Sequence, residues 1–162
     1  MVTIFGGFQD GEASNEGQAS EQPADVRDGG TDSAVPSEEK PQVRWSGELV
    51  AVYKEVDLDS TPPSRTWGGA GDMHASWGTP KGSTVSAYFT YGGEGVELDP
   101  KVKATPETCE ERISTHGVDS LDVEVGTRFC VLTDSGRTAL FDVKSVDIEA
   151  EDFTAQATIW EK

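Results

Sequence analysis

The aromatic and large aliphatic residues of this 162-residue chain lie almost entirely beyond residue 42, and this boundary limits what the chain can fold into. Residues 9–42 contain Ala and two Val, but no Leu, Ile, Phe, Trp or Tyr. Such a segment cannot bury enough apolar surface to offset the entropy lost on ordering it. The sequence therefore predicts a disordered acidic tether over residues 1–42 and a folded domain over residues 43–162.

Residues 1–8, MVTIFGGF, differ from the rest of the tether because they are apolar. They lack the basic start and the longer apolar core of a secretory signal. Two interpretations stay open. In one, Met1 lies within a longer reading frame and residues 1–8 are the outer end of a membrane helix. In the other, they are an ordinary N-terminus with a few apolar residues.

The charge of the chain excludes several kinds of partner. Thirty Asp and Glu stand against 13 Lys and Arg, which gives a net charge of −17. Such a surface repels nucleic-acid phosphates and anionic membrane faces, so we expect no nucleic-acid partner. A transmembrane helix needs a run of about 18 apolar residues, and no such run occurs, so we expect no direct membrane insertion by this chain.

Short alternating patterns, typical of strands with one buried face, recur through residues 43–162. They cover residues 45–53, 84–91, 122–132, 138–148 and 153–160, and residues 72–77 can pair as a further short strand. Residues 128–148 resemble a hairpin around the turn at Asp134–Gly136, with the last strand beside it.

The alternation also predicts which side chains share a face. The sets are Val85, Ala87 and Phe89, Ala139, Phe141 and Val143 (with a phase shift before Val146 and Ile148), and Phe153, Ala155, Ala157 and Ile159. In the first strand, Leu49, Val50 and Val52 are available for burial.

One segment, between Thr105 and Gly117, has the signals of a short helix. Thr105 can cap its start, and Pro106 stands at the first helical position. Cys109 and Ile113 are four residues apart and share a face, while Gly117 can end the helix in a left-handed conformation. One helix with six or seven strands predicts a mainly β domain, built as a small barrel or a sandwich.

The two cysteines leave three interpretations open. Cys109 and Cys130 are compatible with one disulfide, which would close a loop of about twenty residues and contribute roughly 3 kcal/mol. They are also compatible with two buried thiols. A zinc site would need His74 and His116 as well, and the ligand spacing typical of such sites is absent. We therefore expect no metal or cofactor.

Several motifs occur in a fixed order: VDLDS at 56–60, CEERI at 109–113, LDVEVGTRFCVLTDSGRTALFDVKSVD at 121–147 and TIW at 158–160. Together they resemble a small extracellular module of actinobacteria, over roughly residues 44–162. That module follows a transmembrane helix and a linker in membrane proteins of unknown function and in some serine/threonine protein kinases. The most specific part, G-T-x-x-C-V-x-T-x-x-G-R, is formed here by Gly126, Thr127, Cys130, Val131, Thr133, Gly136 and Arg137.

The resemblance implies that Cys109 and Cys130 form a disulfide and that the domain is extracellular or at the cell surface. It implies no catalytic residues. The chain departs from the pattern because it has no membrane helix and no kinase motifs. Gly126 and Gly136 mark turns at the two ends of one strand, and Arg137 can bond turn carbonyls or pair with an acid.

Asp57 and Asp59 would lie on one side of an extended segment. Paired carboxylates can bind Ca²⁺ or perform acid–base chemistry. A calcium ion needs six to eight oxygens, so Asp72 or loop carbonyls would have to join the pair. The alternative is a solvated or capping pair that closes the turn before Pro62 and Pro63.

Trp67 and Trp77 lie in a loop-rich stretch and allow two interpretations. They close one end of the core, or they form an exposed aromatic platform for a ligand.

These observations favour a non-catalytic, extracellular, membrane-proximal interaction or sensing module. Its partner would be an unidentified cell-surface protein or small ligand. One alternative is an extracytoplasmic hydrolase that uses His74, although no GxSxG motif is present. The other is an acidic cytosolic inhibitor of a basic partner.

Overall fold

The computed structural model describes residues 40–90 and 92–162 of the chain. The apolar segment 1–8 and nearly all of the predicted tether lie outside the described residues. Where the chain is described, no helix has the length and apolar character needed to cross a membrane.

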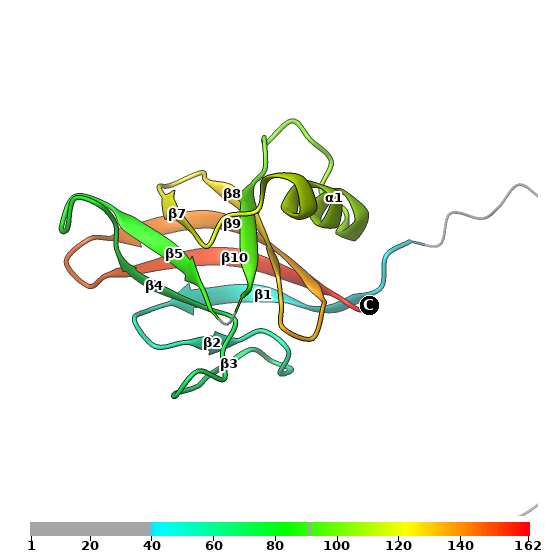
Figure 1. Cartoon of the computed structure of the whole chain (residues 1–162), viewed down its shortest axis with the longest axis horizontal. Helices are drawn as coiled ribbons and strands as arrows, with labels where there is room; N and C mark the ends of the chain where they lie inside the picture. Colours follow the sequence, from blue (N-terminus) through cyan, green and yellow to red (C-terminus); the bar gives the residue numbers. More distant parts are fainter. Residues whose placement is uncertain (1–39, 91) are drawn as a thin grey trace, which may run out of the picture. The chain divides into compact units, whose positions relative to one another are not determined.

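The fold is mainly β, a sandwich of two five-stranded antiparallel sheets with one helix (Figure 1). In spatial order, sheet A consists of β1 (Val43–Ala51), β10 (Asp152–Trp160), β9 (Thr138–Asp147), β8 (Arg128–Leu132) and β6 (Glu94–Glu97). Sheet B consists of β3 (Ser64–Arg65), β2 (Val56–Asp57), β4 (Met73–Trp77), β5 (Val85–Phe89) and β7 (Ser120–Val123).

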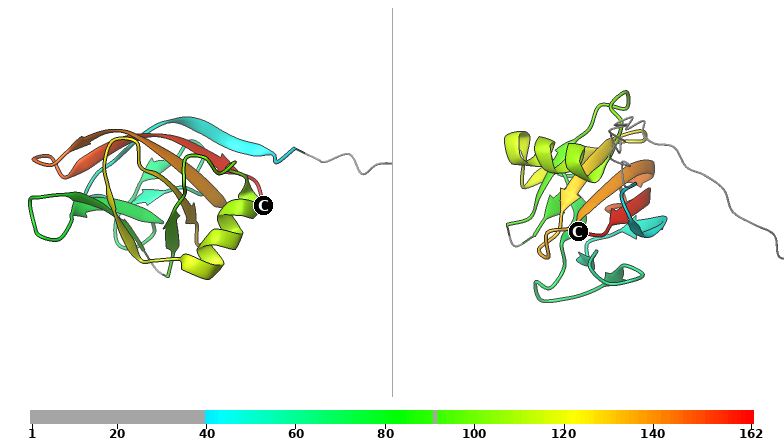
Figure 2. Two further views of the ribbon diagram at one scale, coloured as in Figure 1. Left: turned by 90° about the horizontal axis from the view of Figure 1, so that it is seen from above. Right: turned by 90° about the vertical axis from the view of Figure 1, so that its right-hand side faces the viewer.

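The predicted sandwich is confirmed, and the barrel alternative is wrong because the two sheets remain separate (Figure 2). The described residues form ten strands, where the sequence predicts six or seven. The additional strands β2, β3 and β6 have only two to four residues each, too few for an alternating pattern to be recognised. The segment 122–132, predicted as one extended stretch, is divided between β7 and β8, which belong to different sheets.

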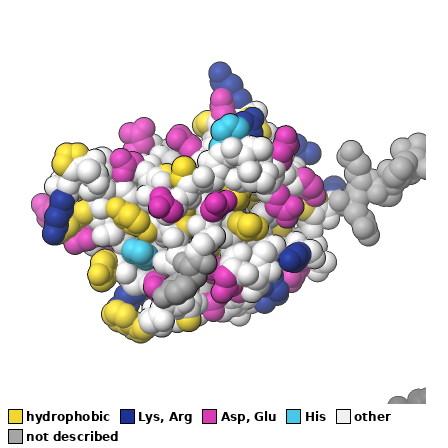
Figure 3. Space-filling view, viewed as in Figure 1, with side chains coloured by type: hydrophobic (Ala, Val, Ile, Leu, Met, Phe, Trp, Pro, Cys, Tyr) yellow, Lys and Arg dark blue, Asp and Glu magenta, His cyan; other side chains and the backbone are white. Residues whose placement is uncertain are grey.

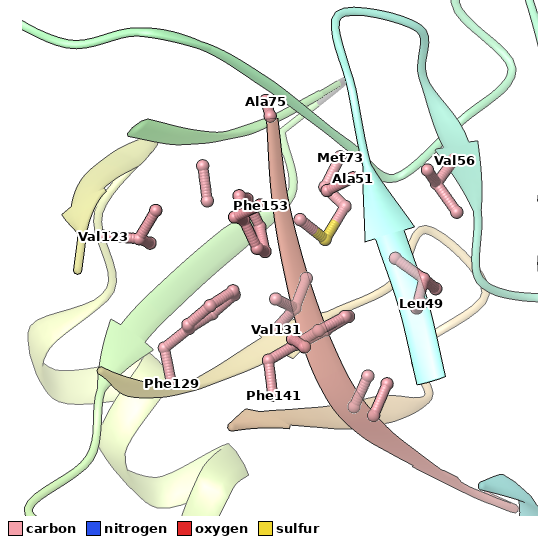
Figure 4. Close-up of a cluster of buried hydrophobic side chains, with 14 of the residues drawn as sticks. Leu49, Ala51, Val56, Met73, Ala75, Val123, Phe129, Val131, Phe141 and Phe153 are labelled. Carbon is pink, nitrogen blue, oxygen red and sulfur yellow. The ribbon is translucent and has the colours of Figure 1, made fainter. Parts of the chain in front are cut away.

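The main core lies between the sheets and is built from the faces that the alternation predicts (Figure 4). Phe129, Phe141 and Phe153 are fully buried at its centre, with ring centroids 4.9 Å apart for Phe129 and Phe141. The predicted inward residues of β5 and β10 are all buried: Val85, Ala87, Phe89, Phe153, Ala155, Ala157 and Ile159. Period-two patterning was therefore sufficient to identify these strands.

Two predicted buried positions are wrong. Val50 is 38% exposed because Leu49 and Ala51 take the inner face of β1, and Ile148 is 41% exposed beyond the end of β9. The predicted phase shift in β9 is confirmed by a register irregularity opposite Thr154 and Ala155.

Helix α1 (Pro106–His116) covers the outer face of sheet A, as the two views in Figure 2 show. The side chain of Thr105 accepts a hydrogen bond from the Thr108 amide at 3.2 Å, so the predicted N-cap is confirmed. The predicted left-handed Gly117 is wrong, because its φ and ψ are −57° and 140°. A side chain there would lie 2.6 Å from the Ile113 carbonyl oxygen, so close packing favours glycine.

A second cluster lies between α1 and sheet A and contains the disulfide. Cys109 and Cys130 are joined, with 5.5 Å between their Cα atoms, so the pairing implied by the resemblance is confirmed. The alternatives of free thiols and of a zinc site that uses both sulfurs are wrong. The bridge fastens α1 to β8, and both cysteines are fully buried. Because such bonds persist in oxidising surroundings, the disulfide indicates an oxidising environment.

Candidate functional site

The structure brings Asp57 and Asp59 together with Asp72, and their carboxylate oxygens lie within 4.8 Å of one another. Asp57 ends β2, Asp59 follows in the next turn, and Asp72 directly precedes β4. One Asp57 oxygen accepts hydrogen bonds from the amides of Asp59 at 2.8 Å and Ser60 at 3.1 Å. Asp57 thereby stabilises the turn that leads to the two prolines.

Asp72 is buried, with 4% of its surface exposed, and each of its carboxylate oxygens accepts an amide hydrogen bond. The donors are Leu58 at 2.7 Å and Asp134 at 2.9 Å. Burial raises the pKa of Asp72 to about 6, and the charges of Asp59 and Asp134 add to this shift. Asp72 therefore joins the segment after β2 to the turn between β8 and β9.

Asp59 forms an ion pair with Arg137, whose guanidinium nitrogen lies 2.7 Å from the carboxylate. It also accepts hydrogen bonds from the Thr133 hydroxyl at 3.0 Å and the Ser135 amide at 3.3 Å. Burial opposes ionisation of Asp59, but Arg137 and these donors outweigh it and hold the pKa of Asp59 below its usual range. Arg137 also approaches Glu161 at 3.5 Å.

We call Asp57, Asp59, Asp72 and Arg137 the acidic clamp. Each of its carboxylates already accepts hydrogen bonds from this chain, and Arg137 supplies the positive charge that a cation would otherwise supply. A hard cation would have to compete with these partners for its oxygen ligands. The geometry therefore favours a structural network over a calcium site or an acid–base pair.

The clamp also shows where two motifs of the resemblance meet in space. VDLDS contributes Asp57 and Asp59, and the β8–β9 turn contributes Thr133, Gly136 and Arg137. Gly136 has a φ of +75°, which favours glycine, and the Thr133 amide donates to the Arg137 carbonyl at 2.8 Å.

The other half of the motif closes the connection between β7 and β8. Gly126 has a φ of +94°, and the Thr127 hydroxyl accepts a hydrogen bond from the Glu124 amide at 3.0 Å. Gly126 and Gly136 thus lie in the turns before and after β8.

The structure does not bring Trp67 and Trp77 together. Trp67 lies in the loop before β4 and is 68% exposed, with the ammonium of Lys54 at 4.5 Å from its ring centroid. Trp77 ends β4, donates its indole N–H to the Ile148 carbonyl at 3.1 Å and lies under Lys81. Among the described residues, no aromatic contact joins the two indoles.

Trp67 instead belongs to a group that we call the aromatic row: Trp67, Tyr53, His74 and Tyr88. His74 on β4 stacks on Tyr88 of β5, with centroids 5.4 Å apart and an interplanar angle of 14°. Tyr53 meets His74 edge-on at 6.2 Å. Figure 3 shows hydrophobic side chains beside a histidine on the face that β4 and β5 present.

A hollow of about 260 Å³ adjoins the row, and Tyr53, Lys54, Glu55, Thr66, Trp67, Gly68 and His74 line it. Glu55 shapes this loop because its carboxylate accepts the Gly69 amide at 2.8 Å and its carbonyl accepts the Thr66 amide at 2.8 Å. The sequence indicated Trp67 but not Tyr53 or Tyr88. Tyr88 could have been found, because the inward set Val85, Ala87 and Phe89 leaves it on the outer face.

His74 lies between two tyrosines and lacks the surroundings of a catalytic base. Burial lowers the pKa of His74, and the nearby Glu55 charge opposes the shift only in part. Within residues 40–90 and 92–162, its buried Nδ1 has no hydrogen-bond partner, and no hydroxyl group is bonded to it. His116 lies at the end of α1, with its ring 2.7 Å from the Thr115 hydroxyl.

No protein-family model, curated protein or solved structure matches the chain.

Proposed function

We propose that residues 43–162 form a non-catalytic recognition module of an extracytoplasmic compartment, and that the aromatic row is its binding surface. The observation that carries this proposal is the exposure of Tyr53 and Trp67, each 68% accessible, beside a hollow. Large aromatic side chains gain most from burial, and they supply a large share of the energy in binding interfaces.

The location is supported by the buried disulfide, since cytosolic thiols are kept reduced in most organisms. The finer expectation of a cell-surface, membrane-proximal position rests on the resemblance to the actinobacterial module. The same bond argues against the cytosolic inhibitor, which predicts reduced cysteines.

The absence of catalysis is supported by the surroundings of His74. A hydrolytic triad needs a nucleophile bonded to the imidazole and an acid that orients it. Across the described part of the chain, His74 has ring contacts with Tyr53 and Tyr88 but no such hydrogen bonds. An esterase and peptidase screen of the purified protein tests this point, and turnover that His74→Ala abolishes would contradict it.

The recognition role can be tested with the labelled full chain on arrays of oligosaccharides and of peptides. We expect retention on some array members that is lost in Trp67→Ala and kept in Trp77→Ala. Trp77 is a matched control because it also lies under a lysine but outside the aromatic row. Retention that never depends on Trp67 would contradict the role of the row.

Thiol titration of the unreduced, denatured protein tests the compartment separately. We expect no reactive thiol in protein isolated from its native host. Two free thiols in that preparation would contradict the extracytoplasmic location without affecting the assignment of the binding surface.

A further inference from the structure

We propose that the aromatic row binds a neutral saccharide, whose rings stack on Trp67 and Tyr53 while its hydroxyls bond the polar groups beside them. This inference rests on the recognition function proposed above and specifies the chemical class of the ligand.

The position of the row limits what can bind there. His74 and Tyr88 are directly paired residues of β4 and β5, and both strands have a hydrogen-bonded neighbour on each side. Their backbone groups serve the sheet, so an extended peptide cannot add a strand at this place. A ligand meets side chains only, and it must cover exposed rings.

A cationic ligand is disfavoured at Trp67. The Lys54 ammonium already lies 4.5 Å from the centroid of Trp67, where a quaternary ammonium would otherwise be attracted. A second positive charge there would meet repulsion. A polyanion is disfavoured by the net charge of −17. A neutral ligand meets neither of these two repulsions.

The polar groups beyond Tyr88 suit a ligand that has hydrogen-bond donors. A second hollow of about 260 Å³ is lined by Thr79, Ser86, Tyr88, Ser120, Leu121 and Asp122. The hydroxyl of Ser86 is directed to the Asp122 carboxylate, and the hydroxyl of Tyr88 donates to the Trp77 carbonyl at 3.2 Å. The same Asp122 oxygen accepts from the Thr84 hydroxyl at 3.4 Å, while its other carboxylate oxygen accepts no hydrogen bond from the described residues and is open to a ligand donor.

A proline-rich segment also stacks on aromatic rings, but its prolines have no N–H to give to Asp122. A sugar ring combines an apolar C–H face with a rim of hydroxyls that both donate and accept. Glu55, which lines the first hollow, adds a carboxylate acceptor for such a rim.

The site is also held in place before any ligand arrives. The Tyr53, His74 and Tyr88 rings pack against one another, and Glu55 fixes the loop that carries Trp67. Little conformational freedom is then lost on binding, which favours measurable affinity from a small contact area.

The test is affinity electrophoresis of the disulfide-intact full chain in native gels that contain soluble neutral polysaccharides. The panel is laminarin, xylan, glucomannan, galactan, arabinan and dextran. We expect at least one to retard the protein. Trp67→Ala and Tyr53→Ala should each lower the association constant by about tenfold or more. Trp77→Ala should leave it within about twofold, and near-UV circular dichroism confirms that each variant is folded.

Each remaining outcome overturns the saccharide inference. Retardation that survives both Trp67→Ala and Tyr53→Ala means that sugars bind elsewhere. No retardation by any polysaccharide, combined with Trp67-dependent retention on a proline-rich peptide array, rejects the saccharide but leaves the recognition function intact. No Trp67-dependent retention on either kind of probe rejects both.

Discussion

The acidic clamp and the aromatic row each contain residues that the sequence indicated as candidate binding residues, Asp57 and Asp59 in the clamp and Trp67 in the row, yet the side chains of the two groups have opposite surroundings. Each clamp carboxylate accepts hydrogen bonds from this chain, and Asp59 pairs with Arg137. Trp67 and Tyr53 are each 68% exposed beside a hollow. Groups with internal partners contribute to stability, whereas groups left open are available to a ligand.

The two regions also differ in the sequence distances that they connect. The clamp joins Asp59 to Arg137 and Asp72 to Asp134, over separations of 78 and 62 residues. The row gathers residues that lie within one stretch of the sequence, Tyr53 to Tyr88, with His74 on β4, Tyr88 on β5 and the other two in loops. Loss of the clamp should therefore weaken the whole fold, and loss of the row should weaken recognition alone.

The largest expected effect is that of Asp59→Ala. This change removes the acceptor of the Thr133 hydroxyl and the Ser135 amide and leaves Arg137 with the longer contact to Glu161, and the Asp59 side chain is only 14% exposed. We expect the free energy of unfolding at pH 7 to fall by about 3 kcal/mol, measured by urea denaturation.

The matched control is Asp142→Ala. Asp142 also faces an arginine, with 3.1 Å between it and Arg128, but its side chain is 36% exposed. We expect a loss below about 1 kcal/mol. Equal losses for the two variants would show that the clamp is no more structural than an ordinary surface pair.

The next effect concerns pH and Asp72. Its pKa is raised in the folded state from 3.8 to about 6, so between these values the folded chain binds more protons than the unfolded chain. The contribution of Asp72 is therefore fully present below pH 3.8 and is lost as the pH rises through about 6. We expect a loss of about 2 kcal/mol over this range.

Denaturation of wild type and Asp72→Asn at several pH values isolates this contribution, which should be missing from the variant. The comparison is needed because His74 acts in the opposite direction. Its pKa is lower in the folded chain than in the unfolded chain, so over the intervening pH range the unfolded chain binds more protons at His74 and stability rises with pH. The carboxyl chemical shift of Asp72 reports its pKa directly. A shift that titrates near pH 4 would contradict the prediction.

A smaller effect should appear on addition of calcium. With Arg137 in place, we expect about 5 mM Ca²⁺ to raise the melting temperature by less than about 1 °C. In Arg137→Gln the carboxylates lose their internal cation, and we expect a rise of about 3 °C. The control Arg128→Gln should behave as wild type. A clear rise in the wild-type protein would mean that the clamp is a cation site.

The parts of the fold that could be predicted depend on local patterns. Strands β5 and β10 alternate strictly, so their buried faces follow from the period of two. The four-residue strand β6 was not predicted, and Gly95 interrupts its alternation of apolar and polar residues. Glycine is needed there because of a contact distant in the sequence: a Cβ at Gly95 would overlap the Phe89 ring. The disulfide between Cys109 and Cys130 was predicted from the resemblance, because the spacing of the cysteines alone was also compatible with free thiols.

The candidate sites were also predictable only in part, because their contacts are not local in the sequence. Asp72 was named as the third carboxylate that a calcium site would need, but its donor from Asp134 lies 62 residues away. Trp67 and Trp77 were treated as a pair because both are aromatic and close in sequence. Trp67 instead lines a hollow together with Tyr53 and His74.

The smallest expected change in stability is that of Trp67→Ala, and it separates the two regions most sharply. Because the indole is 68% exposed and its described contact is the Lys54 ammonium, its removal should change the free energy of unfolding by less than about 0.5 kcal/mol. Trp77→Ala removes a partly buried indole and its bond to Ile148, so it should cost more, about 1 kcal/mol. Binding should show the reverse order, with Trp67→Ala the more damaging change. If Trp67→Ala destabilises the fold as much as Asp59→Ala does, the aromatic row is part of the scaffold, and its exposure says nothing about recognition.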